Sequence, residues 1–203
     1  MDANFNHEQS LTLINEMIQR AQNNVRKGKT YSMIFWGYVI AAAAVTNSVL
    51  IYTLSNPNQS FLIWLVTIPA FVVSYFIERS DTRAVLVKTH IDKIGSMVWT
   101  GFAVSIYVFL AVIFTIAYRF EAPAIFLLIT PVILIMIGTG QFVTACVYRS
   151  KKWYWVAALF WAGAIVSAFL LVRTQYIVLA ACMLFGFIIP GYLLNHQAKK
   201  SHV

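Results

Sequence analysis

The sequence predicts an all-α membrane protein, a polytopic bundle of six transmembrane helices in three hairpins, with an amphipathic helix before it on the cytoplasmic side. Of the 203 residues, 60% are hydrophobic and 11% are charged, whereas a soluble domain carries about 25% charged residues. Residues 122–148 run for 27 positions without a formal charge. As a helix they would extend roughly 40 Å, which exceeds the bilayer's hydrocarbon core of about 30 Å.

Residues 1–30 are predicted to form the cytoplasmic amphipathic helix. Asn6 followed by Gln9 resembles a capping box, and Gly28 supplies a stop. Apolar residues recur at helical spacing on one face of this segment: Leu11, Ile14, Met17, Ile18, Ala21 and Val25. Such a helix can lie among lipid headgroups, pack under the bundle or bind a protein partner.

Charges and turn formers divide the remaining chain into six spans. Residues 30–77 carry no charge and are too long for one crossing, so the turn formers at 55–59 are expected to divide them. The predicted spans are 31–54, 60–77, 95–118, 122–148, 153–172 and 174–194, in a bundle of residues 31–195 that is followed by a cytoplasmic tail, 196–203. Between the second and third spans, the charged residues 78–95 are expected to continue as an amphipathic helix outside the membrane.

The basic residues predict the orientation. Thirteen of the 15 Lys and Arg residues fall in the termini and in the connections on one side of the six spans, and only Arg119 and Arg173 fall on the other side. The positive-inside rule therefore places both termini in the cytoplasm. The same distribution explains the net charge of +8 by attraction to anionic lipid headgroups, with no nucleic-acid partner.

The first two hairpins show a faint internal likeness. Ser32-Met33 and Ser96-Met97 stand 64 residues apart near the starts of their spans, and Pro69 and Pro131 stand 62 residues apart in the second helices. A duplicated hairpin and chance similarity between apolar helices both account for this pattern.

No catalytic constellation is present in the sequence. All seven Asp and Glu residues fall in tails, loops or span ends, and all four His residues fall on the predicted cytoplasmic side. Ionisable groups within the spans, which membrane catalysis and proton-coupled transport use, are missing. The chain also lacks a GxSxG elbow, a P-loop and the HExxH or paired-cysteine spacing of a metal site. The sequence therefore predicts no enzyme activity, no cofactor and no metal, and Cys146 and Cys182 are predicted to be small packing residues.

Neutral polar residues in the spans are the remaining candidates for a site. Asn47, Thr67 and Thr130 fall at similar depth, and with Tyr107 they could line a shallow pocket for a ligand. The alternative is that each side chain bonds a neighbouring helix or its own backbone, as is common for such residues in membranes.

Two further positions are predicted to be bends or close helix contacts. Gly138, Gly140 and Gln141 form one group in the inner half of the fourth span, and Pro190 and Gly191 form the other near the end of the sixth. In the fifth span, the pairs Ala158/Ala162 and Ala164/Ala168 can support close packing, either within the bundle or between protomers.

Several short motifs together resemble small multi-pass inner-membrane proteins of bacteria that have no assigned activity. They are His7-Glu8-Gln9-Ser10-Leu11, Val25-Arg26-Lys27-Gly28, Trp36-Gly37-Tyr38 and Gly191-Tyr192-Leu193-Leu194-Asn195. In size and number of spans, the chain also looks like the substrate-binding subunits of energy-coupling-factor vitamin transporters. Those often carry an Ala-x-x-x-Ala pair in their first span. Here Ala41 to Ala44 are followed by Val45, so the pattern is incomplete.

These features lead to two functional expectations. The first is a non-enzymatic protein of the bacterial inner membrane that regulates, senses or assembles through its cytoplasmic face. Besides the lipid bilayer, it would contact a protein partner or a second copy through residues 1–30 and 78–95. The alternative is a transporter or substrate-binding subunit for a small neutral or amphipathic solute.

Overall fold

Helices make up almost all of the chain that the computed structural model describes, residues 31–83, 90–148 and 151–200. No strand occurs in these segments, and the predicted all-α bundle is confirmed. The predicted N-terminal helix lies outside the described residues, as do residues 84–89 of the charged link, residues 149–150 and the last three residues of the tail.

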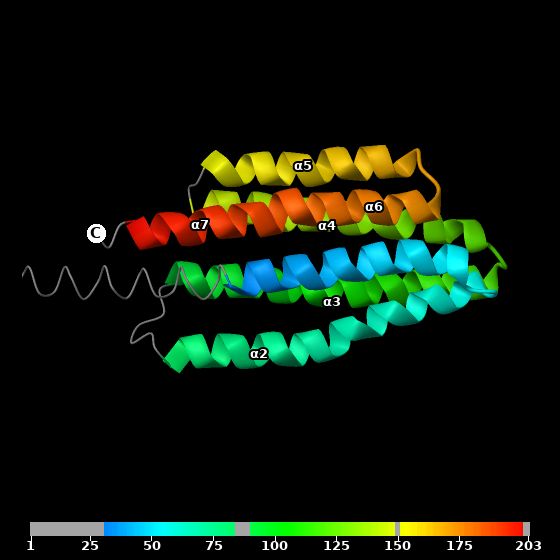
Figure 1. Cartoon of the computed structure of the whole chain (residues 1–203), viewed down its shortest axis with the longest axis horizontal. Coiled ribbons are helices and arrows are strands. Elements are labelled where there is room, and N and C mark those ends of the chain that lie inside the picture. Colours follow the sequence, from blue (N-terminus) through cyan, green and yellow to red (C-terminus); the bar gives the residue numbers. More distant parts are fainter. Residues whose placement is uncertain (1–30, 84–89, 149–150, 201–203) are drawn as a thin grey trace, which may run out of the picture.

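The described helices follow one another as three hairpins (Figure 1). We call the helix Tyr31–Thr53 the first span. The other elements are η1 Pro57–Val66, α2 Thr67–Arg83, α3 His90–Arg119, η2 Pro123–Leu128, α4 Ile129–Val147, α5 Lys151–Ala168, α6 Val172–Met183, η3 Leu184–Ile188 and α7 Ile189–Lys200. α2 and α3 extend beyond the apolar stretches. Residues 78–83 and 90–95 of the charged segment 78–95 are therefore helical.

Five helices are long and apolar enough to cross a membrane. They cover Tyr31–Thr53, Gln59–Ile77, Lys93–Arg119, Pro123–Val147 and Val172–His196. The apolar helix Trp153–Ala168 is shorter, because α5 ends at Ala168 and not at Val172 as the sequence predicted. The chain turns there through tight bonds from Phe169 N–H to Val166 O (3.2 Å) and from Leu170 N–H to Ser167 O (3.1 Å). These findings describe a multi-pass membrane protein.

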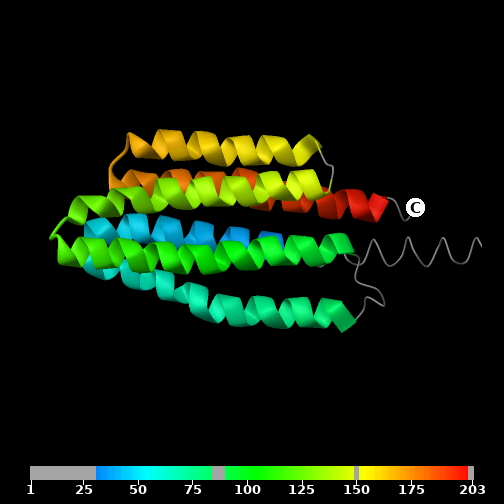
Figure 2. The same ribbon diagram turned by 180° about the vertical axis from the view of Figure 1, so that it is seen from behind.

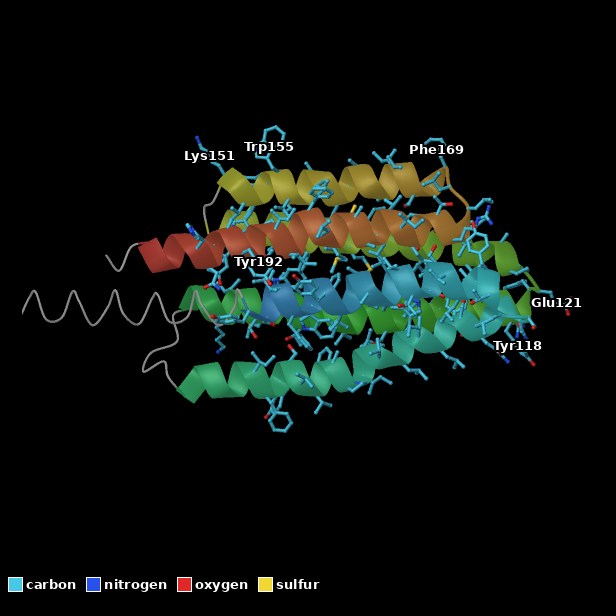
Figure 3. The ribbon with its side chains drawn as sticks, in the orientation of Figure 1. Tyr118, Glu121, Lys151, Trp155, Phe169 and Tyr192 are labelled. Atoms are coloured by element: carbon cyan, nitrogen blue, oxygen red, sulfur yellow. The ribbon has the colours of Figure 1, made fainter. Side chains whose placement is uncertain are left out.

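The helices run side by side with their connections at two ends (Figures 1 and 2). In Figure 1 the first span and the α6–α7 helix lie in front of α3 and α4, and Figure 2 shows α3 and α4 from the other side. α5 forms one edge of the bundle and α2 forms the other. The tight turns of all three hairpins lie at the end that carries Tyr118 and Glu121, which we call the Glu121 end, and Lys151 lies at the opposite Lys151 end (Figure 3).

Two proline residues coincide with a change of helix type. Pro69 is the third residue of α2 and Pro131 is the third residue of α4, and each α-helix directly follows a 3-10 segment. Proline has no N–H to bond the carbonyl four residues earlier. The carbonyl freed by Pro131 is that of Leu127, and Gln175 Nε2 of α6 donates to it at 3.2 Å. The second helices of the first two hairpins thus share one local structure.

A π-helical turn interrupts the last span. In η3, Leu184–Ile188, the hydrogen bonds span five residues, as in the bond from Ile189 N–H to Leu184 O. Pro190 follows at once and cannot donate to the preceding turn. The predicted irregularity near Pro190 and Gly191 therefore takes the form of a π-bulge, a local widening of the helix.

Glycines set the closest helix contacts. Gly163 of α5 lies against Cys182 Sγ of α6 and 3.8 Å from Leu134 of α4, measured from the position of an added Cβ. An added Cβ on Gly186 of η3 would overlap the Phe160 ring of α5. Small residues let helices approach closely in a membrane, where van der Waals packing rather than the hydrophobic effect joins them. These contacts hold α5 against the last span.

Replacing Gly163 by Ala should destabilise the bundle, because the added methyl group would overlap Cys182 Sγ. We expect a loss of about 1–3 kcal/mol in the free energy of unfolding, measured by unfolding in detergent micelles. Gly101→Ala is the matched control, since no atom lies within 4 Å of an added Cβ there. Adding Cys182→Ala should restore part of the loss. Equal stability of the Gly163 and Gly101 variants would contradict the packing.

Candidate functional site

Asn47 lies at the centre of a buried polar cluster that joins the first span to η1 and α6. Its side chain is 0% exposed. In the amide orientation that satisfies both ends, Nδ2 donates to Ser60 O (3.1 Å) and Ser60 Oγ (2.8 Å), and Oδ1 accepts from Trp64 Nε1 (2.8 Å). The Tyr176 ring of α6 lies 5.9 Å from the Trp64 ring and completes the cluster. Asn47, Ser60, Trp64 and Tyr176 form what we call the Asn47 cluster.

A second set of contacts lies next to this cluster at the Glu121 end. Ser48 Oγ donates to the backbone oxygen of Arg173 at 3.1 Å. The Arg173 guanidinium lies 4.7 Å from the centre of the Tyr52 ring, within the range of a cation–π interaction. The first span is thereby joined to the start of α6 by a hydrogen bond and a charged contact.

The other three predicted pocket residues have different surroundings. Thr67 Oγ1 donates to Trp64 O of its own chain segment at 2.7 Å. Thr130 is buried next to Pro131, whereas Tyr107 is 53% exposed on the surface of α3. The structure therefore brings Asn47 together with Ser60, Trp64 and Tyr176, and it places Tyr107 on the outside of the bundle.

The glycine group in α4 packs against aromatic residues of two neighbours. An added Cβ on Gly138 would lie 2.6 Å from the Trp161 ring and 3.2 Å from the backbone oxygen of Ala157, both in α5. Gly140 meets the Trp99 ring of α3 at 3.7 Å. Gln141 follows directly and is buried, and its Oε1 has no hydrogen-bond partner. This part of α4 is a close contact with α5 and α3.

The group at Pro190 and Gly191 lies against the first span. An added Cβ on Gly191 would overlap the Ile34 side chain, and one on Gly37 of the first span would lie 2.8 Å from Ile188. The hydroxyl groups of Tyr38 and Tyr192 lie 3.3 Å apart beside this contact. The π-helical turn thus packs closely on the first span and on α5 through Gly186, Phe187 and Ile188, which are buried.

A hollow and the titratable residues offer no further site. The end of α3 and the following turn line a surface hollow at the Glu121 end, with Thr115, Ala117, Tyr118, Arg119 and Glu121. None of the predicted pocket residues lines it. Within residues 31–83, 90–148 and 151–200, no three His, Cys, Asp or Glu side chains come together as a metal site would require.

Sequence reasoning missed the partners in these contacts. Ser60 and Trp64 stand four residues apart at the start of the second span, which is the spacing of one helical face, and this was the available signal. Gln175 is a neutral amide just inside the sixth span, and it was not singled out. Trp36 Nε1 of the first span donates to Ser74 Oγ of α2 at 3.0 Å. The sequence shows only two polar groups in apolar helices there, which does not predict that they pair.

Comparison of the chain with protein-family models, curated proteins and solved structures finds no match. The resemblance to small bacterial membrane proteins stays a prediction from the motifs that suggested it. The arrangement itself gives a clear role to its polar groups, because the bonds of Asn47, Ser48, Trp36 and Ser74 all run between different helices or chain segments. These four polar side chains join helices, whereas Thr53, Thr67, Thr100, Thr115, Thr139, Thr144 and Ser167 donate to backbone oxygens three or four residues earlier.

Replacing Asn47 by Leu should destabilise the protein, because the Ser60 hydroxyl and the Trp64 N–H would be left buried without their partner. An unsatisfied buried group costs about 1–3 kcal/mol, measured as the change in unfolding free energy in micelles. Thr46→Leu, at the exposed neighbouring position, should change stability little. If both variants unfold alike, the Asn47 cluster does not join the helices.

Proposed function

We propose that this chain is a non-enzymatic protein of the bacterial inner membrane that acts as a regulatory, sensing or assembly component through its cytoplasmic face. The observation that carries this proposal is the Asn47 cluster. A polar residue that was a candidate for a ligand pocket is 0% exposed and bonded to a neighbouring segment. This placement supports helix packing over the transporter alternative.

The distribution of charge supports the cytoplasmic face as the working surface. Arg119, Glu121 and Arg173 are the charged residues near the Glu121 end of the spans, and Lys93 and Lys151 lie near the opposite end. In the sequence, the segments that connect to the helices at the Lys151 end are the basic ones: both termini and the links 78–95 and 149–152. The positive-inside rule favours a cytoplasmic location for that end. The charged segment 78–95 and residues 1–30 then lie on the same side, available to a partner.

The outer surface of α5 supports assembly with another membrane helix. Ala158 and Ala162 are exposed, whereas Ala164 is buried in the bundle. Trp155 (81% exposed) and Phe169 (85% exposed) point away from the bundle at the two ends of α5 (Figure 3). Small residues four apart are typical of helix contacts in membranes. Ala164 therefore packs within the bundle, and the exposed Ala158 and Ala162 support a contact with a second copy or with another protein.

The proposed orientation predicts the accessibility of single cysteines. In a Cys146→Ser background, Glu121→Cys should react with a membrane-impermeant maleimide added to intact cells, because it lies at the opposite end from the cytoplasm. Lys151→Cys should react only after permeabilisation, and the buried Cys182 should contribute little background. Labelling of both positions from outside would contradict the orientation.

The proposed role predicts that the chain has a partner in its native membrane. In the same Cys146→Ser background, Ala158→Cys should form disulfide-linked adducts with a second copy or with another membrane protein. Val108→Cys, on the exposed surface of α3, is the control. Pull-down after lipid-phase crosslinking should identify the adduct. Recovery of neither a self-adduct nor a partner, through α5 or through chemical crosslinks to residues 1–30 and 78–95, would count against the proposal.

A further inference from the structure

Two buried glutamines carry an amide oxygen that has no protein partner. Gln141 of α4 and Gln175 of α6 are each 1% exposed, and Oε1 of each accepts no hydrogen bond. They differ in this from Asn47, which is bonded at both ends of its amide. Buried polar atoms are nearly always hydrogen-bonded to protein or to ordered water. These two oxygens therefore require a donor.

The orientation of the Gln175 amide is fixed by its own bonds. Nε2 donates to Leu127 O (3.2 Å) and to Leu170 O (3.1 Å). Both partners are carbonyl oxygens, so exchanging Oε1 and Nε2 would lose both bonds. The Oε1 atom must remain on the other side of the amide as an acceptor. The donor that satisfies it has to come from outside the protein's own hydrogen bonds.

The two glutamines lie on opposite sides of an apolar layer. At its centre, Gly163 packs against Leu134 of α4 and Cys182 of α6, so these two residues share one level of the bundle. α4 and α6 run in the same direction (Figure 1). Gln141 follows Leu134 by seven residues, and Gln175 precedes Cys182 by seven. At 1.5 Å per residue, each amide lies about 10 Å from that level, on opposite sides of it.

The layer between the amides is closely packed and has few polar atoms. It consists of the side chains of Leu134, Phe160, Leu179, Cys182 and Met183, each 5% exposed or less. These residues belong to one contiguous core cluster. Apolar spaces of this kind remain dry, whereas buried water accompanies polar groups and makes about three hydrogen bonds there.

We propose that Gln141 Oε1 and Gln175 Oε1 each bind an internal water molecule, and that the layer between them contains none. At Gln175 the water can donate one hydrogen to Oε1 and the other to a second lone pair of a nearby carbonyl. Water fits the requirement because both acceptors are neutral amide oxygens. α4 carries no charged residue, and the charged residue of α6, Arg173, has its guanidinium at the Tyr52 ring. The protein thus holds two hydrated sites and a dry centre that seals the bundle.

Radiolytic hydroxyl-radical footprinting with mass spectrometry tests this in the full chain in lipid nanodiscs, because radicals formed from a bound water modify the side chains next to it. Tyr176 follows Gln175 in the chain, and the Trp99 ring packs on Gly140, next to Gln141. We expect modification of Tyr176 and Trp99, and protection of Cys182 and Met183, although sulfur side chains are the more reactive type. Protection of Tyr176 and Trp99 to the level of Met183 would overturn the proposal, as would strong modification of Cys182.

Matched variants assign each water to its amide. Gln175→Met should remove modification of Tyr176 and leave that of Trp99, and Gln141→Met should do the reverse. Gln59→Met, at an exposed residue of η1, should change neither. The assignment would be contradicted if either single variant lost the modification of both Tyr176 and Trp99. It would also be contradicted if a variant lost the modification of neither. If a variant does not fold, the unaltered chain still decides. Modification of the buried Tyr176 above the level of Met183 supports the water at Gln175, and protection of the partly buried Trp99 contradicts the water at Gln141.

A second measurement separates a bound water from an oxygen that is unpaired. Met has nearly the length of Gln and no acceptor oxygen, so it would remove a destabilising group if Gln141 Oε1 were unpaired. The Tm of Gln141→Met would then rise by a few degrees, about 2–4 °C for each kcal/mol in a chain of this size. We expect no rise, because the variant loses the bonds of the bound water. The proposal does not depend on the proposed function, and a rise in Tm would overturn only the water site at Gln141.

Discussion

The rest of the structure depends on one constraint, which is that a polar group in the hydrocarbon of a bilayer must find its hydrogen bonds inside the protein. The all-helical backbone follows from it directly. Three of the prolines in the spans show how local the response is. Pro69 and Pro131 follow 3-10 segments, and Pro190 follows a π-helical turn. The carbonyl freed by Pro131 is bonded by Gln175 of another helix, so a backbone interruption in α4 becomes a contact with α6.

The same constraint explains where the side-chain polar groups lie. Asn47, Ser48 and Ser74 are buried and join the first span to η1, α6 and α2. Each bond fixes the rotation of one helix relative to another, which apolar packing alone leaves weakly specified. Glycines complete the arrangement, because Gly37, Gly163 and Gly186 bring the last span close to the first span and α5. The last span is therefore packed closely against two neighbouring helices at these glycines.

Hydropathy and charge predicted the bundle, the hairpins and five of the six crossing segments, because these depend on properties that run along the chain. The partners of each polar group depend on how each helix is rotated, and a single sequence does not specify that rotation. Asn47 and Gln141 were recognised as unusual, but Ser60 and Gln175 were missed, since their importance arises from residues far away in sequence. The sequence predicted that the fifth span ends at Val172, whereas α5 ends at Ala168. Phe169, Leu170 and Leu171 form a turn, and because they are apolar, hydropathy alone does not distinguish them from a transmembrane helix.

The contacts of α2 give the proposed cytoplasmic role a structural basis. Its preceding segment η1 is fixed to the first span by the Asn47 cluster at the Glu121 end. Further along, α2 meets the first span through Ser74 and through the Phe71 ring, 5.9 Å from Trp36. Many of its large apolar side chains are exposed. α2 is thus held firmly at one end and more lightly towards the charged segment 78–95. Because that segment joins α2 to α3, a partner bound there would act first on α2, whose large apolar side chains are mostly exposed.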